Sequence, residues 1–374
     1  MSDDQNDPQH ACSLIMELIC FSFLFSLCSF LSISAESQLI MATAAVQSVA
    51  PPVLRGSVDE CFPDGLAQNG GRIPTERVGF LKPTNLSLPL DEMRQRLKQD
   101  GYLFIKGLIP REDVLDMRES YFCQYAETSL LEPGTSPRDG IFNSSSHPDA
   151  HKGIGGSGLP ADPVEEKVLI DAHKDPQYRD FVEHPALTGF IRRLMDWKEH
   201  RILDRTMLRH NVPFGLGTGI HYDKLFLRGG EGFFLTAWVP IGDIAINGGG
   251  LCYLKNSVPL GKHVENDYTK RAESFTEQER ISAFNVNMLD GGMIASSPQN
   301  FQAMHSEHGE HRWLVTDYEA GDVVFHDPYS IHASGRNEDK AGHIRLSSDL
   351  RFYNKSDPGI DQRWYKIWAP GDGL

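Results

Sequence analysis

The stretch "GIHYDKLFLRGG" (residues 219–230) contains an imidazole and a carboxylate two residues apart, His221 and Asp223, at the start of an apolar run. Residues i and i+2 of an extended strand point to the same side, so both side chains can reach one point in space. Imidazole nitrogen and carboxylate oxygen are common ligands of transition metals. The spacing therefore predicts that the two residues hold a metal ion from the start of a strand.

The His-x-Asp pattern occurs three times, and the surrounding residues separate the three cases. The pair that begins at His147 lies in a loop-like stretch, which gives two ligands no rigid support. The pair that begins at His173 precedes Pro176, which predicts a helix with Asp175 as its N-cap. Only the pair at His221 begins a strand in the β-rich half of the chain. We favour it as the metal site over a solvent-exposed strand end.

An iron site of the 2-His-1-carboxylate type needs one more histidine and leaves coordination positions open on non-haem Fe(II). The segment "DVVFHDPYSIHASGRN" offers two candidates, His326 and His332. His326 precedes Asp327 and Pro328, which is typical of a structural turn residue. His332 leads into a second strand-like piece. We favour His332 and keep His326 as the alternative.

A rival histidine cluster lies in "HSEHGEH", which contains His305, His308 and His311. On a helix this spacing would gather the three rings on one side. Gly309 and the polar surroundings favour a surface loop instead. We therefore prefer a surface loop to a metal site, and leave contact with a substrate open.

The composition is that of a globular protein, with 374 residues, 40% hydrophobic and 23% charged. The formal net charge of −15 argues against nucleic acid or an acidic membrane surface as a partner. It also disfavours a polyanionic substrate, unless a local basic pocket overrides the total. The six cysteines form no CxxC pair, which argues against a disulfide framework or a zinc cluster. This usage is typical of a reducing compartment and favours a cytoplasmic location.

The first forty residues differ from the rest of the chain. Residues 14–33 are apolar enough to cross a bilayer, but no Lys or Arg precedes them and Glu17 interrupts them. We expect residues 1–40 to be a hydrophobic N-terminal extension or a mis-assigned start. One alternative is a signal or an anchor, through which the protein would be attached to a membrane, and another is a packed helix.

Residues 41–85 are rich in proline and glycine and are expected to form an extended arm. Residues 86–374 are expected to form a single domain with an insertion at about 262–311. "LSLPLDEMRQRLKQDGYLFIKGLIPREDVLDMRES" predicts a helix, a short strand and a second helix. Residues 133–163 hold many Gly, Ser and Pro, which predicts a long loop that is either a lid or disordered.

After the amphipathic helix expected at "PALTGFIRRLMDW", the chain changes to short strands separated by glycine turns. The expected strand segments are "RILDRTMLRHN", "HYDKLFLRG", "FFLTAWVPIGD", "GGLCYLKNS", "RWLVTDYEAGDVVFHD", "SIHASG" and "HIRLSSDLRFYN". Helices followed by many strands predict a mainly β fold with flanking helices (α+β). The core would be a double-stranded β-helix, that is, a cupin-like jelly roll.

Several of these segments together resemble the phytanoyl-CoA dioxygenase family of Fe(II)- and 2-oxoglutarate-dependent oxygenases. The likeness runs from about Gly101 to Phe352. It rests on the order and spacing of "DGYLFIKGLIP", "GIHYDKLFL", "FFLTAWVPIGDIAINGGGLCYLKNS", "IHASGRN" and "RLSSDLRFY". The resemblance implies that His221, Asp223 and His332 are the iron ligands, and it points to no catalytic residue beyond them.

The resemblance also implies that Arg345 in "HIRLSSD" holds the distal carboxylate of 2-oxoglutarate. A guanidinium binds a carboxylate through two parallel hydrogen bonds and stays charged when partly buried. Ser334 and Ser347 are expected to donate hydroxyls to the same carboxylate. The alternative for Arg345 is a solvated strand arginine, with Arg351 and Arg336 as the fallback residues for the cofactor.

Three further residues match cofactor-pocket positions of the family. Trp238 in "TAWVPIGD" matches a tryptophan beside the cofactor, and core packing explains it nearly as well. Met207 in "RTMLRHN" and Lys167 in "EEKVLI" match less securely, and a solvated charge is an equal alternative for Lys167. The run "NGGGLCYL" departs from the family pattern by one extra glycine and by Cys252 and Tyr253.

The implied activity is that of a dioxygenase that uses Fe(II), 2-oxoglutarate and O₂ to oxidise a C–H bond of a small organic molecule. A secondary metabolite is the expected substrate. Halogenating relatives lack the carboxylate ligand, so Asp223 favours hydroxylation or a related oxidation. Residues 133–163 and 262–311 are expected to line or cover the substrate pocket.

Two other functions stay open at this point. One is a cupin-type metalloenzyme that does not use 2-oxoglutarate, for which Arg345 would be dispensable. The other is a non-catalytic jelly-roll binding protein with a vestigial metal site. The presence of all three candidate ligands argues against the second.

Overall fold

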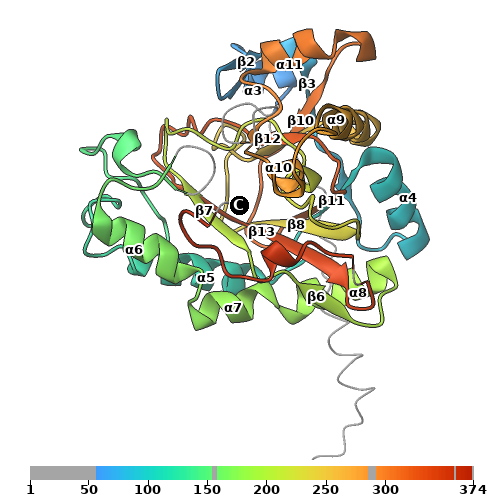
Figure 1. The fold of residues 1–374 in the computed structure, drawn as a ribbon. Helices are drawn as coiled ribbons and strands as arrows, with labels where there is room; N and C mark the ends of the chain where they lie inside the picture. Colours follow the sequence, from blue (N-terminus) through green and yellow to red (C-terminus); the bar gives the residue numbers. More distant parts are fainter. Residues whose placement is uncertain (1–55, 154–157, 285–291, 358, 373–374) are drawn as a thin grey trace, which may run out of the picture. The chain divides into compact units, whose positions relative to one another are not determined.

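The computed structural model describes residues 56–153, 158–284, 292–357 and 359–372, all of which fall within one compact unit (Figure 1). The expected N-terminal extension, residues 1–40, lies outside the described residues, as does the first part of the expected arm. In the described part of the chain, every helix is too short or too polar to cross a membrane.

The elements follow the chain in the order expected for an α+β protein. The helices are α3 (Val58–Cys61), α4 (Leu90–Asp100), α5 (Arg111–Cys123), α6 (Pro163–Ala172), α7 (Pro176–Val182), α8 (Pro185–Met195), α9 (Val258–Arg271), α10 (Glu277–Ile281) and α11 (Pro298–Met304). The 3₁₀ turns are η2 (Thr75–Arg77), η3 (Pro148–Ala150), η4 (Asp223–Leu225), η6 (Ser306–His308) and η7 (Gln362–Trp364).

The strands are short, apart from the last one. They are β1 (Leu66–Gln68), β2 (Gly71–Ile73), β3 (Val78–Phe80), β4 (Pro83–Thr84), β5 (Tyr102–Ile105), β6 (His200–Ile202), β7 (Met207–Asn211), β8 (Phe234–Pro240), β9 (Leu251–Leu254), β10 (Trp313–Val315), β11 (Val323–His326), β12 (His332–Ser334) and β13 (Arg345–Asn354).

Two mixed, mainly antiparallel sheets form the core. The larger has the order β4-β5-β11-β8-β13-β6, with β7 also pairing with β13, and the smaller has the order β12-β9-β10-β3. One buried cluster joins Phe104 and Trp238 of the larger sheet to Tyr253 and Leu314 of the smaller. The two sheets therefore pack face to face, and the expected jelly-roll core with flanking helices is confirmed.

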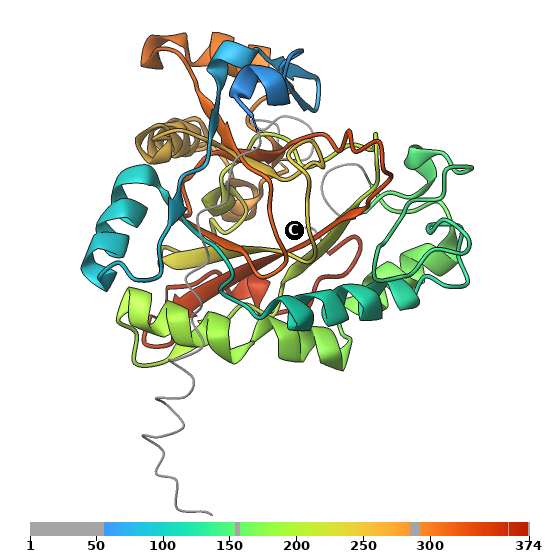
Figure 2. The same cartoon turned by 180° about the vertical axis from the view of Figure 1, so that it is seen from behind.

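Helices α5, α7 and α8 cover the outer face of the larger sheet (Figures 1 and 2). The strands alternate accordingly: Leu350 and Phe325 point outward into the helices, where Phe325 stacks on Phe190 of α8 at 5.3 Å between ring centroids. The residues between them point to the interior of the jelly roll. This alternation sets which side chains of β8, β11 and β13 can reach a site between the sheets.

Most of the expected elements occur where the sequence predicts them. The helix–strand–helix unit is α4, β5 and α5, and "PALTGFIRRLMDW" forms α8. Asp175 caps α7 by accepting hydrogen bonds from the backbone N–H groups of Gln177 and Tyr178, as predicted. Within residues 133–163, the described part contains η3, single β-bridges and the first residue of α6, so it is mainly loop.

The prediction of a strand at "HYDKLFLRG" is wrong. His221 forms a single bridge with His332, after which the chain turns into η4 at Asp223. The backbone N–H of Lys224 bonds to the carbonyl of Pro328, and that of Phe226 to the carbonyl of Asp223. The apolar residues of this run are buried in a turn, which their alternation alone does not distinguish from a strand.

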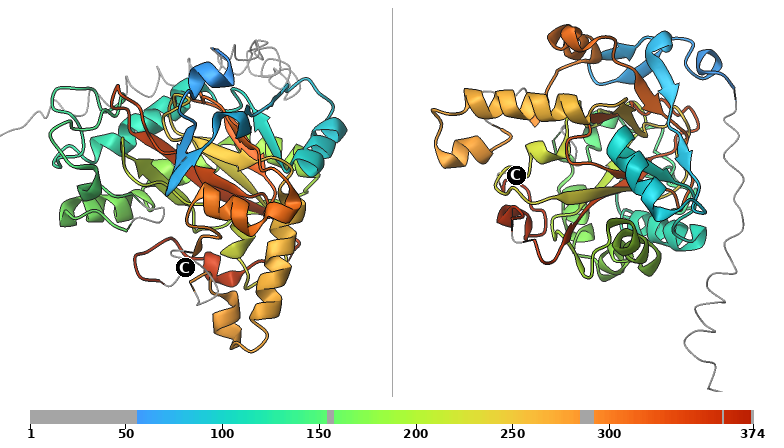
Figure 3. Two further views of the ribbon diagram at one scale, coloured as in Figure 1. Left: turned by 90° about the horizontal axis from the view of Figure 1, so that it is seen from above. Right: turned by 90° about the vertical axis from the view of Figure 1, so that its right-hand side faces the viewer.

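The insertion after β9 is helical and lies on one side of the sheets. It holds α9, α10, α11 and η6, and Figure 3 shows α9 and α10 extending away from the sheets. The hydroxyl of Tyr222 donates to Glu265 of α9 at 2.6 Å, and Arg228 pairs with the same carboxylate at 2.9 Å. The insertion is therefore tied to the segment that carries His221 and Asp223.

Candidate active site

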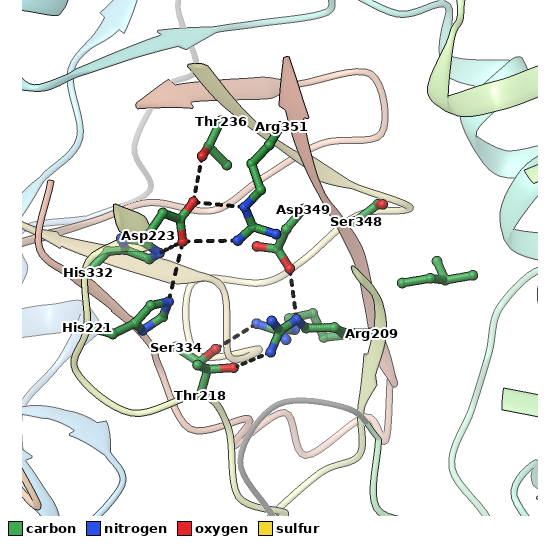
Figure 4. Close-up of polar contacts among 12 residues, drawn as sticks. Arg209, Thr218, His221, Asp223, Thr236, His332, Ser334, Ser348, Asp349 and Arg351 are labelled. Atoms are coloured by element: carbon green, nitrogen blue, oxygen red, sulfur yellow. Dashed lines mark hydrogen bonds and ion pairs between the residues drawn. The ribbon is translucent and has the colours of Figure 1, made fainter. Parts of the chain in front are cut away.

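The bridge between residue 221 and β12 brings the three candidate ligands together (Figure 4). His221 and His332 exchange two backbone hydrogen bonds of 3.0 and 2.9 Å. One ligand atom from each of His221, Asp223 and His332 lies within 4.8 Å of the others, and all three side chains are buried. Each histidine Nε2 lies 3.8 Å from Asp223 Oδ1. These positions suit three ligands on one face of a metal ion.

Hydrogen bonds orient both imidazoles toward this point. His221 Nδ1 lies 2.8 Å from the carbonyl of Gly219, and His332 Nδ1 lies 2.9 Å from the carbonyl of Ser330. A carbonyl only accepts, so each Nδ1 carries the proton and each Nε2 presents its lone pair. Burial lowers the pKa of both histidines, most strongly for His332. Both rings are therefore neutral and ready to bind a metal.

Asp223 is held by three side chains from the larger sheet. Thr236 of β8 donates to Oδ2 at 2.5 Å, and Arg351 of β13 bonds to both oxygens, at 3.0 Å from Nη2 and 3.3 Å from Nε. Burial alone would raise the pKa of Asp223, but the charge of Arg351 and the hydrogen bond from His326 hold it well below its usual range. The carboxylate is therefore ionised and fixed in direction.

The alternative ligand His326 has a supporting position. Its Nε2 lies 3.3 Å from Asp223 Oδ2, and its Nδ1 lies 3.1 Å from the hydroxyl of Tyr253. Because the carboxylate only accepts, Nε2 carries the proton and points at Asp223. The structure thus places His326 behind the carboxylate and His332 beside the open face.

Arg345 lies on the interior face of β13 and reaches β12 of the facing sheet, the strand that carries His332. Its Nη1 donates to the hydroxyl of Ser334 at 3.0 Å and to the carbonyl of Gly249 at 2.9 Å. Ser334 follows His332 by two residues, so roughly 6.5 Å of strand separates the two positions. Burial lowers the pKa of Arg345 to about 10, which leaves it charged at neutral pH.

Two buried polar atoms beside this arginine fit a carboxylate ligand. Arg345 Nε and Ser347 Oγ make no hydrogen bond within the described residues. A buried donor without a partner costs free energy, so these atoms suit a ligand that supplies acceptors. The distal carboxylate of 2-oxoglutarate has the charge and the oxygens to do so.

The two fallback arginines lie elsewhere. Arg351 is engaged with Asp223, and Arg336 donates to the carbonyl of Phe214 near the surface. Trp238 is buried on the interior face of β8, in edge contact with Tyr318 at 4.7 Å. Met207 is buried at the start of β7, opposite Asp349 of β13.

The structure does not bring Lys167 to the site. It lies on α6 with its side chain 77% exposed, and it pairs with Asp171 one turn later on the same helix. This is the solvated charge given above as the alternative to a cofactor contact. The match of its short segment to the family carried no information about the direction of its side chain.

The rival cluster around "HSEHGEH" forms no metal group in the described part of the chain. His305 and His311 both pack on the ring of Phe301, with centroids 4.9 Å away in each case. His308 ends η6 beside His263 of α9. The expectation of a surface segment holds for His308, while His311 is buried.

Two residues of the site were not found from the sequence. Arg209 of β7 and Asp349 of β13 lie on the same interior face, with Nε and Oδ2 2.8 Å apart (Figure 4). For Asp349 the signal was present in "RLSSDLR", where charged residues alternate through a strand whose intervening residues are apolar or small. In an antiparallel sheet such alternation places all of these charges on one face.

The described part of the insertion reaches the candidate metal face. Ile220 forms a β-bridge with Ala295, and the ring of Phe226 lies in edge contact with His221 at 5.6 Å. Phe284 contacts Phe226 in turn, at 6.4 Å, and is 52% exposed. Aromatic side chains therefore border the site on the insertion side, whereas charged ones border it on the β13 side.

A jelly roll that carries two neutral histidines and one carboxylate on one face has the ligand set of non-haem Fe(II) oxygenases. A sequence model of the phytanoyl-CoA dioxygenase family matches residues 97–345, more than half of the chain. The chain belongs to this family. It is an Fe(II)- and 2-oxoglutarate-dependent dioxygenase, as the sequence resemblance implied.

Several solved structures are similar to this chain at low sequence identity. They include the non-haem α-ketoglutarate-dependent carbocyclase SnoK from nogalamycin biosynthesis, with 16% identity and a TM-score of 0.44 over 79% of this chain and 96% of that chain. AviO1 from Streptomyces viridochromogenes Tue57 has 13% identity and a TM-score of 0.42 over 74% and 100%. HygX from Streptomyces hygroscopicus, solved with nickel and 2-oxoglutarate, has 13% identity and a TM-score of 0.38 over 71% and 87%. No curated protein matches the sequence.

Proposed function

We propose that His221, Asp223 and His332 hold the iron, and that Arg345 with Ser334 and Ser347 holds the distal carboxylate of 2-oxoglutarate. The observation that carries this assignment is the pairing of two features. Three buried ligand atoms converge on one point, and a buried arginine with an unpartnered Nε bonds to Ser334, two residues past the ligand His332. Neither a cupin-type enzyme without 2-oxoglutarate nor a binding protein needs the second feature.

The residues of the chain orient the three metal ligands. Iron with 2-oxoglutarate and O₂, when bound, supplies the oxidising power that attacks a C–H bond. Gly219 and Ser330 carbonyls fix the tautomers of the two imidazoles. Thr236, His326 and Arg351 fix Asp223. Because Asp223 is present and held as an ionised ligand, hydroxylation or a related oxidation is favoured over halogenation.

We propose a small organic molecule, of the secondary-metabolite type, as the substrate. The aromatic border of Phe226 and Phe284 supports an apolar substrate body beside His221. The net charge of −15 argues against nucleic acid. The cysteine spacing, which gives no disulfide framework, supports a cytoplasmic location.

The assignment is tested by anaerobic visible spectroscopy of the full chain, titrated with Fe(II) and then with 2-oxoglutarate. A weak charge-transfer band is expected only when both are present. Arg345→Ala should abolish the band while iron still binds, and His332→Ala should abolish iron binding itself. Arg336→Ala, which removes an arginine outside the site, is the matched control and should keep the band.

Each failure has a distinct meaning. Iron binding without a band in the unmodified protein would contradict the 2-oxoglutarate site and favour the cupin-type enzyme. Absence of iron binding would favour the binding protein. If the band survives in Arg345→Ala, a different arginine binds 2-oxoglutarate.

A further inference from the structure

Arg209 lies inside the jelly roll beside the candidate metal ligands, and the assignments above give it no role. In the β7–β13 pairing it stands opposite Ser347, so it shares the interior face with Arg345 and Asp349. Its side chain is 14% exposed. Its guanidinium bonds to Thr218, which precedes the candidate ligand His221 by three residues.

The contacts of Arg209 leave it incompletely satisfied. Nη1 donates to the hydroxyl of Thr218 at 3.0 Å (Figure 4). Nε lies 2.8 Å from Asp349 Oδ2, yet neither atom forms a hydrogen bond, because the N–H is not directed at the oxygen. Arg209 and Asp349 therefore form an ion pair, but Nε still lacks a hydrogen-bond acceptor.

The unpartnered atoms of the described residues concentrate on this face. Six of the fifteen buried side-chain atoms without a hydrogen-bond partner belong to the interior residues of β7 and β13, namely Arg209 Nε, Asn211 Oδ1, Arg345 Nε, Ser347 Oγ, Asp349 Oδ2 and Arg351 Nη1. Buried polar atoms are nearly always hydrogen-bonded in folded proteins. The carboxylate of 2-oxoglutarate accounts for those next to Arg345 but not for those around Arg209.

The charged side chains of the site carry a net charge of one positive unit. Three arginines (Arg209, Arg345 and Arg351) face two aspartates (Asp223 and Asp349). Fe(II) and the dianion of 2-oxoglutarate carry equal and opposite charges, so binding both leaves this excess unchanged. A buried charge without a counter-charge is costly, whereas a ligand that supplies one is favoured.

We propose that the substrate carries a carboxylate or a similar anionic group, and that Arg209 is the residue that binds it. The proposal rests on the proposed function, because it presumes that 2-oxoglutarate occupies Arg345. The substrate is then an amphiphilic acid. Its anionic group meets Arg209 on the β7 side, and its apolar body lies against Phe226 and Phe284. The acidic surface of the protein does not oppose this, because the basic charge is local.

The test uses the full chain loaded with Zn(II), a redox-inert ion, and saturating 2-oxoglutarate. The probes are pairs of a carboxylic acid and its primary amide on aromatic and saturated ring frames, which differ in charge but hardly in shape. Ligand-observed NMR gives the dissociation constants. A charge-assisted hydrogen bond predicts that the acid of at least one pair binds about tenfold more tightly than its amide.

Variants test whether Arg209 causes the preference for the acid over the amide. Arg209→Met should remove it, and Arg209→Lys, which keeps the charge, should restore part of it. Asp349→Asn removes the competing anion and should strengthen acid binding. Arg111→Met is the matched control, because it breaks an exposed Arg–Asp pair with Asp243 at 2.6 Å, and it should change nothing.

Four outcomes would overturn the proposal. The first three are equal binding of acid and amide in every pair, no binding of any acid, and an acid preference that survives in Arg209→Met. The fourth is loss of acid binding as 2-oxoglutarate is raised, since it would mean that the acids occupy Arg345. The Fe(II)–2-oxoglutarate band is measured on the same proteins. If the band is present but the preference is absent, only this inference fails, whereas absence of the band in the unmodified protein defeats the proposed function.

Discussion

At the scale of single residues, the interaction that distinguishes this site is the fork of Arg351 on the ligand carboxylate. Both side chains are almost fully buried, at 3% and 1% exposure, and Arg351 bonds to both oxygens of Asp223. Removing one partner of such a pair leaves the other charge uncompensated, at a cost of about 3–5 kcal/mol. We therefore expect Arg351→Met to lower the free energy of unfolding of the metal-free protein by roughly that amount, measured by urea denaturation.

A metal ion should offset this loss, because its positive charge replaces that of Arg351 beside Asp223. Fe(II) or Zn(II) is expected to raise the melting temperature of Arg351→Met more than that of the unmodified protein. Equal metal-dependent shifts in the two proteins would contradict the view that Arg351 and the metal share one carboxylate. Arg111→Met serves again as the control with an exposed ion pair.

At the scale of elements, the contact between α9 and the ligand segment couples the insertion to the site. Glu265 accepts from Tyr222, which stands between two candidate ligands, and pairs with Arg228, whose side chain is 4% exposed. Glu265→Ala should leave Arg228 buried without its counter-charge and loosen α9. We expect faster hydrogen exchange over residues 258–281 and weaker iron binding, measured by mass spectrometry and by titration.

The matched control on the same helix is His263→Ala. Its pair with Asp267 is half exposed, and such surface pairs contribute about 0–1 kcal/mol. Exchange over α9 should therefore stay unchanged in this variant. If Glu265→Ala left both hydrogen exchange and iron affinity unaltered, the insertion would not support the site.

The elements also show what the sequence could and could not predict. Local patterns were sufficient for α4, β5, α5 and α8, because periodicity and capping are properties of neighbouring residues. They were insufficient for "HYDKLFLRG", where the turn at Asp223 depends on a backbone bond to Pro328, more than a hundred residues away. The pairing of Arg209 with Asp349 likewise depends on the register between β7 and β13.

The candidate site shows the same division. His221 and Asp223 stood out by their spacing, but the preference for His332 over His326 needed the family resemblance. The structure supplies the physical difference between the two. His332 bridges to His221 through the backbone, whereas His326 lies on β11 and points at the back of Asp223. Strand pairing of this kind leaves no trace in a single sequence.

At the scale of the whole described unit, buried histidines make stability depend on pH. His173 and His210 are fully buried beneath the larger sheet, and burial lowers the pKa of each from 6.5 to about 4. Between these two values the unfolded chain binds more protons than the folded one, so stability is complete above about pH 6.5 and is lost as the pH falls toward 4.

The shift corresponds to roughly 3 kcal/mol per histidine, and further histidines with lowered pKa, such as His200 and His305, act in the same direction. Urea denaturation followed by tryptophan fluorescence should thus show a steep loss of unfolding free energy between pH 6.5 and 4.5. His173 is the sharper case, because Nδ1 donates to the carbonyl of Leu169 and Nε2 accepts from the N–H of Leu208, so its proton acceptor is occupied. His173→Gln should flatten the pH dependence of the unfolding free energy, whatever the variant's stability at pH 7.5. If the unmodified protein were equally stable at pH 4.5 and pH 7.5, these histidines would not be buried in the neutral form.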